Sequence, residues 1–121
     1  DADGYVTIVG RGKDLIISGG YNIYPKEIEL FLDAQPGVKE SAVIGAPHPD
    51  FGESVVALLV PENGAEIDLA AIEAAARADL AGFKRPRHVA VIEALPRNTM
   101  GKVQKAELRK TYERVFRHKA G

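Results

Sequence analysis

The spacing of apolar residues along the chain predicts a mixture of strands and helices. Short runs of β-branched and apolar residues, each bounded by turn-forming residues, are typical of strands. Such runs occupy residues 5–9, 14–17, 38–46, 54–60 and 88–92. The first two flank a Gly-containing turn and predict a β-hairpin, whereas the later three predict a buried sheet. After the hairpin, Ser18, Gly19 and Gly20 should break the strand and let the backbone bend or approach a ligand closely.

Apolar residues at helical spacing predict three helices. They run from 25 to the Pro-Gly pair at 36–37, from 69 to about 80, and from 104 to about 117. Pro25 suits the first position of a helix, and Asp68 is a suitable N-cap for the second. The pattern therefore predicts a small α+β domain, with an N-terminal β-hairpin followed by a three-stranded sheet that is packed by helices.

The composition is that of one folded domain, and it excludes several kinds of site. The chain has 121 residues, of which 45% are hydrophobic and 27% charged. It has no Cys, which excludes disulfides, thiolate metal sites and a Cys nucleophile. No apolar run reaches the ~18 residues of a membrane helix, so no membrane partner is expected. The chain opens without Met on a turn-like stretch, as expected for a cut made inside a longer polypeptide.

The charges are unevenly distributed although the net charge is only −1. Residues 1–83 carry five Lys or Arg and fourteen Asp or Glu, a net −9, whereas residues 84–121 carry eleven and three, a net +8. A basic segment on an acidic domain indicates either an anionic partner or a solvated basic helix. A non-catalytic module that binds nucleic acid through this segment is therefore one hypothesis, to be tested against the loops described next.

Three loops combine Gly or Pro with a central basic residue. Residues 10–14 read Gly-Arg-Gly-Lys-Asp, but they join two strands and so do not form a dinucleotide fingerprint. Residues 83–88 hold Phe83, Arg85 and Arg87, which could grip a phosphorylated nucleotide or simply form a basic loop. Residues 96–103 place Lys102 after a Gly without forming a P-loop, because the first Gly and the final Ser or Thr are absent.

No other set of residues competes with these loops. The three His residues lack metal-ligand spacing, so no metal site is expected, and Ser18 and Ser41 lack a nucleophile elbow. Read locally, the sequence indicates an α+β domain with basic loops and no more.

Taken together and in this order, the loops resemble the C-terminal domain of adenylate-forming enzymes, a superfamily of acyl-CoA synthetases, luciferases and peptide-synthetase adenylation domains. Residues 10–23 with 27–29 look like its hinge and pantetheine-loop motif, and residues 96–102 look like its terminal catalytic-lysine motif. The resemblance covers nearly the whole chain. It implies one C-terminal lid domain over residues 1–121, with a hinge near residues 11–14 and a large N-terminal domain that is absent here.

The resemblance also implies an activity and its cofactors. Such enzymes join a carboxylic acid to AMP from Mg²⁺-ATP, then pass the acyl group to coenzyme A. Their lid turns between the two steps about the hinge. The Mg²⁺ ligands lie in the N-terminal domain, so the isolated chain is expected to be inactive.

The family's roles fall on particular residues of this sequence. The resemblance makes Lys102 the catalytic lysine of the first step, Arg11 a contact of the nucleotide ribose, and Lys13 the hinge. For the second step it places the pantetheine arm against Gly19 and Gly20. The coenzyme A nucleotide would then contact Phe83, Arg85 and Arg87, as in some related ligases.

The flanking residues sharpen the resemblance to one subfamily. Residues 22–29, 47–53 and 95–105 look most like malonyl-CoA synthetases, with the lid of a fatty-acid or aryl-acid CoA ligase as the alternative. In related bacterial enzymes such a lysine is acylated by a protein acetyltransferase and restored by a deacylase, so Lys102 is also a candidate modification site. A cytoplasmic enzyme that acts on no nucleic acid is expected.

Overall fold

The structure, a computed structural model, describes residues 15–80 and 82–116. It contains strands β2 (Ile16–Ser18), β3 (Tyr21–Ile23), β4 (Val38–His48), β5 (Gly52–Pro61) and β6 (His88–Val91). Its helices are α1 (Pro25–Asp33), α2 (Leu69–Asp79) and α3 (Lys105–Thr111), with a single 3₁₀ turn, η2, at Gly82–Lys84. The predicted α+β fold is confirmed. The strand expected at residues 5–9 and the turn at 10–13 lie outside the described residues.

The five described strands form one sheet, which contains the three predicted strands β4, β5 and β6 together with β2 and β3. β4 pairs antiparallel with β5, from Val38 opposite Pro61 to His48 opposite Gly52. β6 runs parallel to β5, and the crossover between them contains α2. The β2–β3 hairpin joins the same sheet because Ser18 pairs with Gly52 at the start of β5.

The segment at Gly19 and Gly20 ends strand β2 and bends the backbone, as expected. These residues form a two-residue hairpin turn between β2 and β3, with φ values of 58° and 88°. Positive φ at both central positions is the requirement of a type I′ turn, whose twist suits a hairpin and which glycine adopts without steric cost. The Gly-Gly pair therefore builds a rigid corner at one end of the sheet.

The helices begin where the sequence predicts. Pro25 occupies the first turn of α1, and the Asp68 carboxylate caps α2 by accepting a hydrogen bond from the Ala71 amide at 3.1 Å. The last helix is shorter than the predicted 104–117, because α3 ends at Thr111. There the Val115 amide donates to the Tyr112 carbonyl, a bond of the tighter i→i+3 kind, so residues 112–116 continue as turns that keep Phe116 buried.

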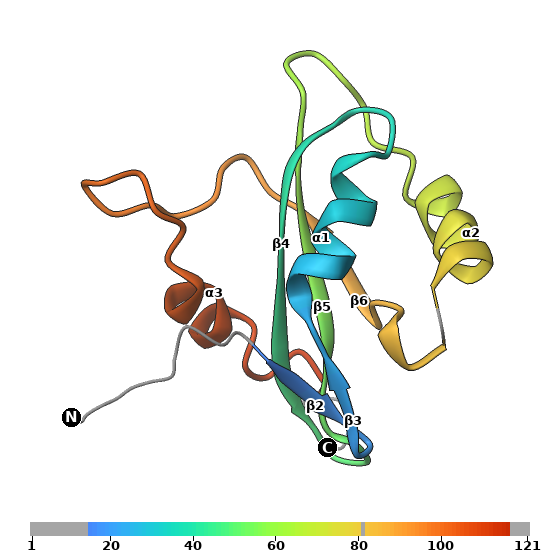
Figure 1. Cartoon of the computed structure of the whole chain (residues 1–121). Coiled ribbons are helices and arrows are strands. Elements are labelled where there is room, and N and C mark those ends of the chain that lie inside the picture. The colour runs from blue at the N-terminus through green and yellow to red at the C-terminus, as the bar shows by residue number, and fades with distance from the viewer. Residues whose placement is uncertain (1–14, 81, 117–121) are drawn as a thin grey trace.

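The sheet is covered on both faces, which gives three layers (Figure 1). α1 and α2 pack on one face, where Ile28, Leu32, Ile72 and Ala76 join Val43, Val55, Ala57 and Leu59 in one buried cluster. α3 packs on the other, where Leu95, Leu108 and Phe116 join Ala42, Ile44, Ala46, Val56, Leu58 and Val60 in a second. Because successive side chains of a strand point to opposite faces, the even-numbered residues of β4 after the bulge at Val38/Glu40 face the α3 layer. Burial on both faces explains why β4 and β5 read as nearly continuous apolar runs.

Candidate functional site

The loop that carries Lys102 is a small, tightly bonded hairpin. Arg97 and Val103 form an antiparallel bridge, and the Asn98 amide donates to the Lys102 carbonyl at 3.0 Å. The Gly101 amide closes a four-residue turn by donating to the Asn98 carbonyl at 2.9 Å, and Gly101 itself has φ +83°. Asn at the first position and Gly at the fourth are the residues that such a turn favours. The local sequence thus determines the shape of the loop.

The Asn98 side chain strengthens this hairpin from within. Its Oδ1 accepts from the Met100 amide at 2.9 Å and from the Lys102 amide at 3.0 Å. An Asn side chain that binds the backbone two residues ahead stabilises a turn without help from the rest of the fold. The backbone on which Lys102 is mounted is therefore held by its own neighbours.

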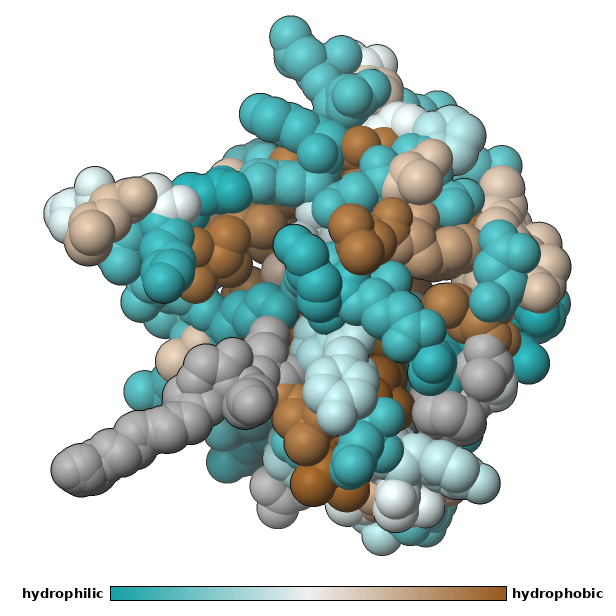
Figure 2. Space-filling model, in the orientation of Figure 1, coloured by the Kyte–Doolittle hydropathy of each residue, from teal (hydrophilic) through white to brown (hydrophobic). Residues whose placement is uncertain are grey.

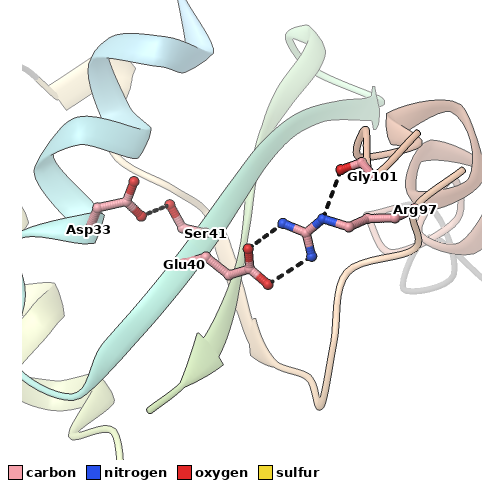
Figure 3. Close-up of polar contacts among 5 residues, drawn as sticks. All are labelled: Asp33, Glu40, Ser41, Arg97 and Gly101. Carbon is pink, nitrogen blue, oxygen red and sulfur yellow. Dashed lines mark hydrogen bonds and ion pairs between the residues drawn. The ribbon is translucent and has the colours of Figure 1, made fainter. Parts of the chain in front are cut away.

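Arg97 ties the hairpin to the sheet (Figure 3). Its Nε donates to the Gly101 carbonyl at 3.1 Å, while Nη1 donates to Oε2 of Glu40 on β4 at 3.1 Å and Nη2 donates to Oε1 of the same carboxylate. The hydrogen bonds from Arg97, with its positive charge, lower the pKa of the Glu40 carboxyl below its usual 4.5. One planar guanidinium thus links Gly101, the residue before Lys102, to Glu40 on β4, which lies 57 residues before Arg97 in the chain.

A second set of contacts holds the other side of the hairpin. The Gln104 amide donates to the Pro96 carbonyl at 2.8 Å, which closes the base of the loop. Lys105, the first residue of α3, forms an ion pair with Glu29 of α1 at 2.7 Å, and both side chains are less than 20% exposed. Glu29 Oε2 also accepts from the Val43 amide of β4 at 2.9 Å. The Lys102 hairpin therefore lies between two charged anchors, one on each side.

Lys102 itself is exposed, and within the described residues its side chain makes no hydrogen bond or ion pair. Met100 at the tip of the hairpin is 87% exposed. Figures 1 and 2 show this loop projecting from the body of the domain on the left. A cation on a rigid projection is suited to reaching into a site formed by another domain.

The Gly19–Gly20 turn lies at the other end of the sheet, against the β4–β5 turn. The Gly19 amide donates to the Phe51 carbonyl at 2.9 Å, and a Cβ on Gly19 would lie 3.6 Å from the Phe51 ring. A Cβ on Gly20 would meet nothing within 4 Å, although its φ of 88° still disfavours other residues. The backbone at Gly20 therefore presents an open face that a slender ligand could approach.

Arg87 completes this end of the molecule. Its guanidinium lies 4.4 Å from the centroid of the Phe51 ring, a cation–π contact, and its amide donates to the Val55 carbonyl of β5 at 2.9 Å. The His48 ring packs on the same Phe51 at 4.6 Å between centroids. Sequence analysis missed Phe51, although it lies in the 47–53 segment that carries part of the family resemblance.

The rest of the basic loop at 83–88 borders a groove of about 630 Å³ beside α2. Arg85 and Arg87 line it together with apolar residues, among them Leu32, Ile72 and Val89. Arg85 Nε also lies 3.4 Å from the Leu80 carbonyl. The side chain of Phe83, like all of Arg11 and Lys13, lies outside the described part of the structure.

The two groups of candidate residues are far apart. The Lys102 hairpin is tied to Glu40 near the start of β4, whereas the Gly19 turn meets β5 opposite His48 at the end of β4. Eight residues of extended strand span roughly 26 Å. The domain thus carries two separate groups of candidate residues, which we call the lysine end (Arg97 to Lys105) and the glycine end (Gly19, Gly20, Phe51 and Arg87).

Other kinds of site are not found in the described residues. Nowhere in 15–80 and 82–116 do three or more His, Asp or Glu side chains gather as metal ligands would. No helix in that part of the chain has the length and apolar character needed to cross a membrane.

Comparison with known proteins agrees with this geometry. A family model of the AMP-binding enzyme C-terminal domain matches residues 27–102. A feruloyl-CoA synthase from an Amycolatopsis species is 46% identical over 112 residues, which are 93% of this chain and 23% of that protein. A sulfoacetate–CoA ligase from Cupriavidus necator is 45% identical over 108 residues, or 89% of this chain and 21% of the ligase. ATP-bound MatB from Rhodopseudomonas palustris superposes with a TM-score of 0.84 at 56% identity, over 97% of this chain and 23% of that one.

The chain therefore spans about a quarter of the length of the relatives it matches. The family model covers more than half of the chain, including the first of the two charged anchors and Lys102. The chain belongs to the family of AMP-binding enzyme C-terminal domains.

Proposed function

We propose that this domain is the moving lid of an AMP-forming acid–CoA ligase, which presents its lysine end in one step and its glycine end in the other. The observation that carries the proposal is the separation of the two ends along β4 (Figure 1). One reacting centre cannot contact both ends at once, since β4 spans roughly 26 Å between Glu40 and His48. A lid that turns between two half-reactions makes use of both ends.

In the first half-reaction, a carboxylate oxygen attacks the α-phosphorus of ATP, the bond to the bridging oxygen breaks, and pyrophosphate leaves. Lys102 would bring its ammonium to the carboxylate and α-phosphate oxygens, where negative charge accumulates. A fixed cation at such a point is worth about 3–4 kcal/mol of barrier lowering. Arg11 would bind the ribose hydroxyls, and Lys13 would be the hinge.

In the second half-reaction, the thiol sulfur of coenzyme A attacks the acyl carbon, the bond to the AMP oxygen breaks, and the thiol proton passes to solvent. The open backbone at Gly19 and Gly20 would border the pantetheine arm. Phe51 supports that turn from behind and positions Arg87. Arg87, with Arg85 and Phe83, would hold the phosphates and adenine of coenzyme A.

The remaining parts of the enzyme would come from the N-terminal domain of the full-length protein. ATP and Mg²⁺ would bind there. Among the described residues, no group of three or more His, Asp or Glu side chains could hold a metal ion. The β2–β3 hairpin and the residues beside it, next to the glycine end, expose large hydrophobic residues, namely Leu15, Ile17, Tyr21 and Tyr24. Figure 2 shows brown residues at this lower end of the molecule. Such a patch fits a surface that docks against the partner domain.

We propose malonate as the acid, with a fatty or aryl acid as the alternative. Support comes from the resemblance of residues 22–29, 47–53 and 95–105 to malonyl-CoA synthetases and from the 56% identity to MatB, a malonyl-CoA synthetase. The curated relatives carry other names at 40–46% identity, including feruloyl-CoA synthase and indoleacetate–CoA ligase. The acid itself would bind in the N-terminal domain, so steady-state assays with malonate, sulfoacetate and ferulate on the full-length enzyme test this choice.

Lys102 is also proposed as a site of reversible acetylation in a cytoplasmic enzyme. The side chain is exposed on a projecting hairpin, which a protein acetyltransferase and a deacylase could reach. Acetylation removes the charge, so it should abolish the first half-reaction. Incubation with acetyl-CoA and a cognate acetyltransferase, followed by peptide mass spectrometry, tests this; an unlabelled Lys102 would count against it.

The contacts argue against the nucleic-acid hypothesis. The basic segment after residue 83 contributes Lys84, Arg97 and Lys105 to ion pairs with the acidic part of the chain. Part of the basic segment is therefore neutralised by ion pairs within the domain and is not available to bind phosphates. Titration with DNA or RNA at several salt concentrations would reopen the question only if affinity fell steeply with salt.

The experiment that tests the ligase proposal restores the N-terminal domain and replaces Lys102 with Ala. The rate of adenylation, measured by pyrophosphate release, should fall 10²- to 10³-fold. The rate of acyl transfer from supplied acyl-AMP to coenzyme A should be largely retained. Gly20→Leu should show the opposite pattern. Loss of both half-reactions in Lys102→Ala, or of neither, would reject the assignment.

A further inference from the structure

We propose that Arg97 and Glu40 form a positioning pair that fixes where the Lys102 ammonium points, so that both residues are required for adenylation although neither touches the substrate. This inference rests on the proposed role of Lys102. It concerns a connection that the loop's own sequence does not provide, because Glu40 lies 57 residues from Arg97.

The hairpin has a fixed internal shape, but its tilt relative to the sheet depends on contacts with the rest of the domain. Its internal bonds, from Asn98 to Met100, Gly101 and Lys102, set the backbone conformation and leave the hairpin free to tilt as one unit. Its base is held by apolar packing, since Leu95 is buried and Val103 packs on the α3-side cluster. Beyond that base, Arg97 is the described side chain that joins the hairpin to β4.

The guanidinium suits this task because it bonds in two directions at once. Nε points back to the Gly101 carbonyl, next to Lys102, and the two Nη groups point outward to Glu40 (Figure 3). A planar fork with three bonds restricts rotation as well as distance, which a Lys ammonium does not do. The guanidinium thereby fixes the orientation of the peptide before Lys102 relative to β4, which is paired along its length with β5.

The backbone of Glu40 is held in the β4–β5 ladder, so its carboxylate can fix the position of Arg97. Glu40 pairs with Val60 in the β4–β5 ladder, directly after a bulge at Val38 and Glu40, and faces the same layer as Ala42 and Ile44. The next residue, Ser41, faces the opposite layer, where its hydroxyl donates to Asp33 at 2.7 Å (Figure 3). Ser41 is thus a matched position on the same strand whose hydroxyl contacts α1, at Asp33 and at 3.5 Å from the Glu29 carbonyl, and not the hairpin.

Stability alone does not account for the arrangement. Glu40 and Arg97 side chains are 24% and 39% exposed, and ion pairs with that much water contribute little to folding. A displacement of a catalytic group by about 1 Å, in contrast, can cost on the order of 10²-fold in rate. The pair is therefore expected to affect the rate far more than the fold.

The test uses the full-length enzyme with its N-terminal domain and measures both half-reactions separately. Arg97→Gln and Glu40→Gln should each lower the kcat of adenylation 10- to 100-fold, with malonate, sulfoacetate or ferulate as the acid, whichever the wild type uses. The KM for ATP should change less than kcat, and acyl transfer from supplied acyl-AMP should stay near the wild-type rate. Arg97→Lys should restore only part of the loss.

Two further variants separate positioning from folding. The exchanged pair Arg97→Glu with Glu40→Arg should recover more adenylation than either single charge reversal. Ser41→Ala, which removes the neighbouring contact on β4, should leave both half-reactions unchanged. The melting temperature of each variant should stay within a few degrees of the wild-type value.

Each outcome is decisive. Equal losses in both half-reactions, or adenylation at the wild-type rate in Arg97→Gln, would overturn the inference. If Lys102→Ala abolishes adenylation while Arg97→Gln does not, the proposed function stands and the positioning role fails. If Lys102→Ala leaves adenylation intact, the proposed function fails first.

Discussion

Gly101 offers the sharpest test of how the Lys102 hairpin is built. Its φ is +83°, in the region that residues with a Cβ rarely adopt, and an added Cβ would meet nothing within 4 Å. Substitution by Ala therefore creates no clash, and its cost is the backbone strain alone. For an L-residue in the left-handed region that cost is about 1–2 kcal/mol.

This strain would act on the turn and not on the core. A penalty of 1–2 kcal/mol lowers the population of the native hairpin by a factor of about 5–30 relative to alternatives. The Gly101 amide would lose its bond to Asn98, and the Gly101 carbonyl would leave the Arg97 guanidinium. We expect Gly101→Ala to slow adenylation by up to that factor, with acyl transfer unaffected.

The matched variant is Gly101→Asn, because Asn tolerates the left-handed region better than other residues. It should be several-fold more active in adenylation than Gly101→Ala. Both variants are measured in the full-length enzyme by pyrophosphate release and by transfer from supplied acyl-AMP. The reasoning is refuted if Ala matches wild type, if Asn is as slow as Ala, or if both half-reactions fall together.

Three further predictions concern the anchors and the glycine end. Phe51→Ala removes the ring under Arg87, a contact of about 0.5–1 kcal/mol, and should raise the KM for coenzyme A about 2- to 5-fold while adenylation persists; Phe51→Tyr should behave as wild type, and a defect in adenylation instead would contradict the assignment of this end. Because hydrogen bonds from Arg97 lower the pKa of Glu40, its carboxylate adds a small stabilisation above pH 4.5 that is lost as pH falls through the lowered pKa. The free energy of unfolding in urea should thus differ slightly between wild type and Glu40→Gln at pH 7, and this difference should close in acid; a difference independent of pH would disprove this. Glu29→Ala leaves Lys105 and the Val43 amide without their acceptor and should cost about 1–3 kcal/mol of unfolding free energy, more than the exposed Asp33→Ala; equal costs would show that the Glu29 anchor is unimportant.

Much of the fold could be predicted because it depends on local rules. The apolar runs of β4 and β5, Pro25 at the start of α1 and the Asp68 cap each express a spacing or torsion set by a few neighbouring residues. The end of α3 could not be predicted in the same way. Tyr112, Val115 and Phe116 keep helical spacing, yet packing on the sheet draws them into turns after Thr111.

The sequence by itself determined the order of the loops, the shape of the Lys102 hairpin and the family to which the pattern belongs, because short-range hydrogen bonds and glycine torsions are encoded locally. Only the tertiary structure decided that Arg97 meets Glu40, that Phe51 lies between Gly19 and Arg87, and that the lysine and glycine ends are separated along β4. These relations depend on how β4 pairs with β5 and on which face each side chain takes. A one-residue shift in that pairing would turn Glu40 away from Arg97 while leaving every local pattern in the sequence unchanged.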